Sequence, residues 1–113
     1  MIMTALLFTA VVAAAPVAKQ RITQAEIELF VGQVKSCWNI LPEDINSGLN
    51  VTLLIDLARD GSVTGNEIGE AFESAAGQRL ARSAMRAVEQ CAPYAFSVET
   101  YEEWKHLELE LRP

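Results

Sequence analysis

The stretch VTLLIDLARDGSVTGNE, residues 51–67, decides the fold. Four apolar residues alternate along its first half and share one side of an extended chain: Val51, Leu53, Ile55 and Leu57. The dipeptide Asp60-Gly61 then supplies the strongest short-range signal for a tight hairpin turn. We therefore predict a strand over residues 51–58, a turn, and a second strand with a bulge at Gly65.

The same segment also resembles a twelve-residue calcium loop running from Asp56 to Glu67. Asp60 and Gly61 occupy the fifth and sixth positions, as such a loop requires. The third position is Ala58, which has no oxygen donor, and the residues before Asp56 suit a strand rather than the helix that enters a calcium loop. The hairpin is therefore the favoured reading. The alternative is a calcium-binding exported domain that uses Asp56, Asp60 and Glu67.

Amphipathic helices flank the hairpin in the sequence. Thr23 and Glu26 match a capping box, which predicts a first helix over residues 24–38. A second helix is predicted after Gly77, ending at Cys91. Its apolar stripe recurs at helical spacing: Leu80, Ala81, Ala84, Ala87, Val88 and Cys91.

The last stretch of the chain alternates again, with leucines on one side and polar residues on the other, which predicts a third strand over residues 105–112. The order helix-strand-strand-helix-strand indicates an α+β fold. We predict a three-stranded antiparallel sheet in the spatial order 2-1-3, with both helices packed on one face. Strands two and three then form the edges. The short turn before the last strand is expected to place three residues inward: Val98, Tyr101 and Trp104.

The composition narrows the function. The chain has 113 residues, half of them hydrophobic, which suits one domain with a packed core. Its formal net charge is −6 and it lacks a lysine-rich run, so we exclude nucleic acid as a partner. We find no motif that joins a nucleophile, a base and oxyanion donors, and His106 is the only histidine. The prediction is a non-enzymatic protein without a cofactor.

Residues 1–18 are uncharged and apolar and end in small residues, which is typical of a secretory signal peptide. Cleavage is expected after Ala14 or Ala18. The predicted domain spans residues 19–113. The alternative is an uncleaved anchor, and membrane contact is expected only in that case.

Cys37 and Cys91 are the two cysteines of this exported chain. An even pair in that setting favours a disulfide, which would join the ends of the two helices. The alternative is two buried free thiols.

Three stretches together resemble the TolA/TonB C-terminal family of Gram-negative cell envelopes, and the TolA C-terminal domain in particular: VKSCWNIL, VTLLIDLARDGSVT and LARSAMRAVEQCAPYAFSVETYEEWKHLELELRP. The resemblance covers about residues 27–113. Members usually carry a membrane-spanning segment and a long periplasmic span before this domain, and this sequence has neither. The resemblance therefore implies a detached recognition domain in the periplasm of a Gram-negative bacterium.

The resemblance also implies partners among envelope or periplasmic proteins, of Tol-Pal or outer-membrane type. An exposed sheet edge can accept an extended peptide as a further strand. We predict that the partner docks on the last strand, along these residues: Lys105, His106, Leu107, Glu108, Leu109, Glu110, Leu111 and Arg112. The alternative is that Lys105, Glu108 and Glu110 only guard the edge against aggregation.

Overall fold

The structure is a computed structural model that describes residues 21–113. The predicted signal peptide, residues 1–18, lies outside the described residues. The elements follow in the order α1 Gln24–Cys37, η1 Pro42–Asp44, β1 Val51–Leu57, β2 Val63–Ile68, α2 Ala75–Cys91, η2 Val98–Thr100, α3 Tyr101–Trp104 and β3 His106–Leu111, where η marks a short 3₁₀ turn.

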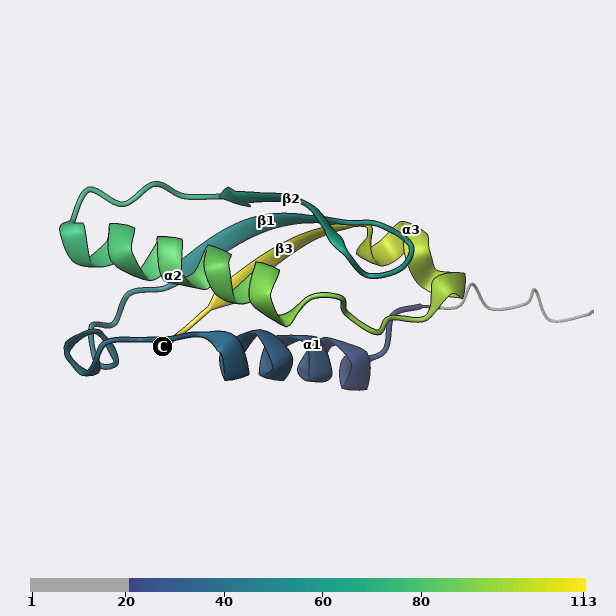
Figure 1. Cartoon of the computed structure of the whole chain (residues 1–113), viewed down its shortest axis with the longest axis horizontal. Coiled ribbons are helices and arrows are strands. Elements are labelled where there is room, and N and C mark those ends of the chain that lie inside the picture. The colour runs from purple at the N-terminus through teal and green to yellow at the C-terminus, as the bar shows by residue number, and fades with distance from the viewer. Residues whose placement is uncertain (1–20) are drawn as a thin grey trace, which may run out of the picture.

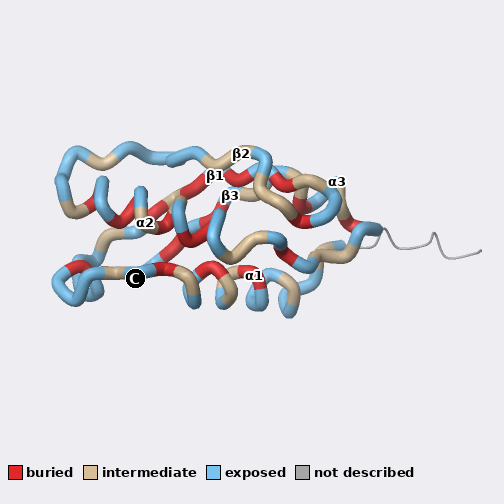
Figure 2. Tube along the Cα trace, viewed as in Figure 1, coloured by how far each residue is buried: buried red, intermediate tan, exposed pale blue. Residues whose placement is uncertain are grey.

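The three strands form one antiparallel sheet in the order β2-β1-β3, which confirms the predicted α+β fold and its topology. Helices α1 and α2 lie side by side along one face of this sheet (Figure 1). Buried residues gather between these helices and the strands, whereas the outer surfaces are exposed (Figure 2). The other face of the sheet carries no helix among residues 21–113.

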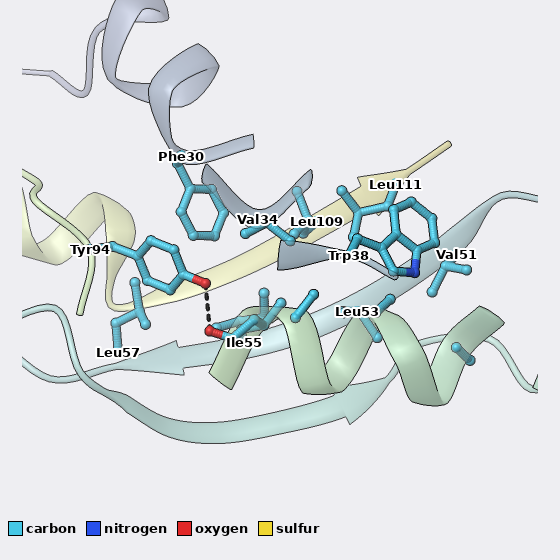
Figure 3. Packing of buried hydrophobic residues seen from close by; sticks show 14 of the residues in the cluster. Phe30, Val34, Trp38, Val51, Leu53, Ile55, Leu57, Tyr94, Leu109 and Leu111 are labelled. Atoms are coloured by element: carbon cyan, nitrogen blue, oxygen red, sulfur yellow. Dashed lines mark hydrogen bonds between the residues drawn. The ribbon is translucent and has the colours of Figure 1, made fainter. Parts of the chain in front are cut away.

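Strand β1 is the centre of the core. The four alternating residues of its helix-facing side have relative exposures of 0 to 2%: Val51, Leu53, Ile55 and Leu57. In Figure 3, Val34 of α1 lies beside Leu109 of β3, and Trp38 lies beside Leu111. Helix α1 therefore covers the β3 side of the sheet, while α2 contacts β1 and β2.

The hairpin contains the predicted bulge, displaced by one residue. Asp56 pairs with Gly65, whereas Leu57 pairs with Val63, so Thr64 is the additional residue. In a regular strand, Val63 and Ile68 would face opposite sides of the sheet, because they are five residues apart. The bulge turns Val63 to the helix-facing side, where it packs against the core.

The caps explain where the helices begin. Thr23 and Glu26 form the predicted capping box, and Glu26 also accepts a hydrogen bond from the Ser97 N–H at 3.1 Å. The backbone hydrogen bond from Ser97, followed by that from Thr23, lowers the pKa of Glu26. Helix α2 begins at Ala75, earlier than predicted, because the Ser74 hydroxyl accepts from the Gly77 N–H and caps the first turn.

Aromatic side chains close the end of the core near α3. Trp104 is fully buried and stacks on Phe96 with ring centroids 5.3 Å apart. Tyr94 is also buried, and burial raises its pKa to about 12. Tyr101, also predicted to point inward, is half-buried and packs against the core. The inward prediction for Val98 is wrong: this side chain is 54% exposed, and Thr100, two residues later in the same 3₁₀ turn, is the buried residue instead.

A disulfide joins Cys37 and Cys91, the last residues of α1 and α2, with Cα atoms 6.0 Å apart. The predicted pairing is thus present. Gln33, one turn before Cys37, donates to the Cys91 carbonyl at 2.6 Å, so a polar contact accompanies the covalent one.

Among residues 21–113, no helix has the length and apolarity needed to cross a bilayer.

Candidate functional site at the outer edge of β3

Both outer strands of the sheet are open in the part of the chain that the structure describes. Strands β2 and β3 each pair with β1 and with no other strand of residues 21–113. An unpaired edge presents a row of backbone donors and acceptors that another extended chain can bind.

The register tells which backbone groups of β3 point outward. The Leu57 N–H donates to the Lys105 carbonyl at 2.9 Å, and the Gly69 N–H donates to the Thr52 carbonyl at 2.7 Å. Odd-numbered residues of β1 therefore direct their backbone groups toward β3, and even-numbered residues direct theirs toward β2. By the same alternation, three residues of β3 turn their N–H and C=O groups away from β1: His106, Glu108 and Glu110.

The side chains of these three residues lie on the open face of the sheet. His106 Nδ1 lies 2.5 Å from Asp56 Oδ1, and Arg112 Nη2 lies 3.7 Å from Glu110 Oε1. Leu54 is 45% exposed between its cross-strand partners Glu108 and Glu67. The open face beside β3 is therefore mainly acidic, with one apolar side chain at its centre.

The helix side of the same edge is apolar. Phe30 and Val34 of α1 are buried, and Gln33 contacts the end of α2. Ile27 and Val31 are one turn apart on the flank of α1 opposite Gln33. Because Gln33 faces the end of α2, we infer that this opposite flank lies toward the outer edge of β3. Ile27 is 38% exposed and Val31 is half-buried, so we call this pair the α1 shelf.

The edge thus offers different surroundings to the two sides of an added strand. Side chains on one side of that strand would meet the α1 shelf and the half-buried Leu107. Side chains on the other side would meet Glu108 and Glu110, which are exposed. Alternating apolar and basic residues are the pattern that fits both.

The ends of the predicted docking segment lie outside the strand. Lys105 precedes β3 and pairs with Glu102, and Arg112 follows it. The structure places the remaining predicted residues, 106–111, in β3 itself. The carboxylates of Glu108 and Glu110, which lie on the open face of the sheet, also suit the alternative role of guarding the edge against aggregation.

The structure forms the hairpin that the sequence favoured over a calcium loop. Residues 56–67 form the hairpin, with Asp56 opposite Gly65 and Glu67 opposite Leu54. The Asp60 carboxylate accepts hydrogen bonds from the Ser62 hydroxyl and N–H, which lower the pKa of Asp60. No group of three histidine, cysteine or acidic side chains among residues 21–113 is arranged to hold a metal ion.

Sequence reasoning found the strand of this site and missed the shelf. The helical spacing of Ile27 and Val31 assigns them to the apolar stripe of α1 without saying which part of the stripe stays exposed. That depends on how α1 crosses the sheet, and the helical spacing alone carries no signal for it.

Comparison with known proteins supports the fold. A family model described as Uncharacterised conserved protein UCP034077 matches residues 19–102. The solution NMR structure of TolAIII bound to a peptide derived from the N-terminus of TolB is similar, with a TM-score of 0.67 and 20% sequence identity. The match covers 89% of this chain and 82% of TolAIII. No curated protein matches the chain. At this identity the structural likeness shows a shared fold.

Proposed function

The chain belongs to the family described as Uncharacterised conserved protein UCP034077, and we propose that it is a non-enzymatic protein-binding module that accepts an extended partner segment along the outer edge of β3. The observation that carries this proposal is the register. It turns the backbone groups of His106, Glu108 and Glu110 outward, on an edge that no strand of residues 21–113 covers. The similar fold of TolAIII in complex with a peptide supports it.

Backbone pairing would supply affinity for any extended segment, so selectivity must come from the side chains. The α1 shelf favours apolar residues at every second position of the partner. Glu108 and Glu110 favour Lys or Arg at the positions between, since opposite charges on adjacent strands attract. The expected partner segment therefore alternates basic and apolar residues.

We further propose that the domain acts after export, in the periplasm, with partners among envelope proteins. The disulfide between Cys37 and Cys91 suits an oxidising compartment. In this proposal residues 1–18 are the export signal, and residues 19–113 are the domain.

The first experiment is an NMR titration of the ¹⁵N-labelled domain with a synthetic peptide of sequence KIRVKLK. We expect the amide shifts to concentrate on β3 and on the α1 shelf. The substitution Glu108→Pro removes an outward N–H and places a ring against the incoming strand, so we expect it to weaken binding by about tenfold or more.

The matched control is Ile68→Pro, which makes the same change at an outward-facing position of β2. This variant should bind the peptide as the parent protein does, provided that both proline variants retain a cooperative thermal transition. Equal losses in the two variants, or shifts confined to α2, would contradict docking on β3.

A further inference from the structure

A second feature lies on α2, on the side of its N-terminal half that faces the segment after α1 (Figure 1). A groove of about 530 Å³ separates that segment from the helix. Its helical wall presents three arginines at positions that share one face of α2: Arg79, Arg82 and Arg86. Its opposite wall includes Ile40, Leu41 and Asp44.

The charges inside this arginine groove do not cancel. Asp44 is buried and lies 3.3 Å from Arg79, which also approaches the exposed Glu43 at 4.0 Å. Within residues 21–113, Arg82 and Arg86 form no ion pair, although both line the groove. Each guanidinium carries five N–H donors and stays charged at any working pH.

Two of the polar side chains that line the groove beside these arginines, Ser83 and Asp44, already have hydrogen-bond partners. The Ser83 hydroxyl accepts from Trp38 Nε1 at 2.8 Å and donates to the Leu80 carbonyl at 2.9 Å. Asp44 is engaged with Arg79. The donors that remain for a ligand thus include Arg82, Arg86 and the exposed side-chain amide of Asn39, on the wall of a concave surface in a chain whose net charge is −6.

We propose that the arginine groove binds an acidic peptide segment of a partner protein, with carboxylates two residues apart. Arg82 and Arg86 are four residues apart on the helix, about 6 Å along its axis. Alternate side chains of an extended chain are about 6.6 Å apart, so they can meet both guanidinium groups. Leu41, which is 49% exposed at the groove, can contact an apolar side chain of the same peptide.

Two other anionic ligands fit less well. Free phosphate would fill only a small part of a groove of about 530 Å³ and would leave Leu41 uncovered. An anionic membrane would attract the arginines but repel the rest of a chain with a net charge of −6. An extended acidic peptide matches the charge, the length and the apolar contact together.

The test uses fluorescence anisotropy with a labelled peptide of sequence TEVEVET at 50 mM salt. We expect binding that weakens steadily as salt rises to 200 mM, because the contacts are ionic and exposed. The double substitution Arg82→Gln with Arg86→Gln should weaken binding by about tenfold or more. Neither arginine forms an ion pair among the described residues, so the double variant should keep the thermal unfolding midpoint of the parent protein.

The charge-matched control is the double substitution Lys35→Gln with Arg59→Gln, at exposed positions outside the groove. The proposal is overturned by an equal loss in this control, by equal affinity for the peptide TQVQVQT, or by binding to phosphatidylserine vesicles or phosphate with no binding to TEVEVET. This proposal does not depend on strand addition at β3. Glu108→Pro should leave TEVEVET binding unchanged, so the two proposals can fail separately.

Discussion

Gly61, in the turn of the hairpin, contacts the segment that follows α2 through one backbone hydrogen bond. Its φ of 82° lies in the left-handed region, as the Asp-Gly turn requires. Its carbonyl accepts a hydrogen bond from the Tyr94 N–H at 2.9 Å. A Cβ at this position would overlap the carbonyl oxygen of Tyr94. Gly48 has a similar φ of 73° but faces open space.

These two glycines form a matched pair for a stability test. Gly48→Ala adds backbone strain alone, and we expect it to lower the free energy of unfolding by about 1 kcal/mol. Gly61→Ala adds the same strain and also displaces Tyr94, so the loss should exceed about 3 kcal/mol. Urea unfolding of the two variants measures the difference. Equal losses would show that the hairpin moves away from Tyr94 without cost.

At the scale of elements, the disulfide ties the two helices together at their C-terminal ends. Cys37 ends α1 and Cys91 ends α2, and 54 positions separate them in the sequence. A cross-link over such a long loop restricts the unfolded chain strongly. It also fixes α1 to α2, and so helps to hold the α1 shelf beside the proposed docking edge.

We therefore expect the double substitution Cys37→Ala with Cys91→Ala to lower the free energy of unfolding by about 4 kcal/mol. The same variant should bind KIRVKLK less tightly, because α1 is less firmly placed beside β3. Urea unfolding of the oxidised parent, the reduced parent and the variant provides the measurement. The reduced parent should match the variant. A loss below about 1 kcal/mol would mean that packing alone positions α1.

For the whole molecule, the two proposed surfaces lie on different elements. In these proposals the β3 edge, bounded by acidic residues on the open face, binds a basic-apolar segment, and the arginine groove on α2 binds an acidic one. A small acidic domain could in this way hold two segments of opposite charge, from one partner or from two. The opposite charge preferences would also keep each segment out of the other site.

Export is the prediction that concerns the whole chain. When the full sequence is expressed in a Gram-negative host, we expect a periplasmic product that begins at Ala15 or Lys19. Mass spectrometry of the intact periplasmic protein identifies the first residue and also shows whether Cys37 and Cys91 are oxidised. Recovery of the uncleaved chain in the membrane fraction would instead support the anchor.

Local patterns in the sequence were enough for the elements and their order. The alternation of residues 51–57, the Asp-Gly turn and the capping box at Thr23 each depend on neighbours a few positions away, so each can be read from the sequence alone. The sheet order followed because two amphipathic helices and three strands have few ways to bury their apolar sides together.

The tertiary structure alone decided what surrounds those elements. The exposure of Ile27 depends on how α1 crosses β3, and the outward direction of Glu108 depends on the register with β1. The arginine groove exists because the segment after α1 folds toward α2, forty residues later in the chain. These features arise from contacts between residues far apart in sequence, and such contacts are set by the packing of the whole domain.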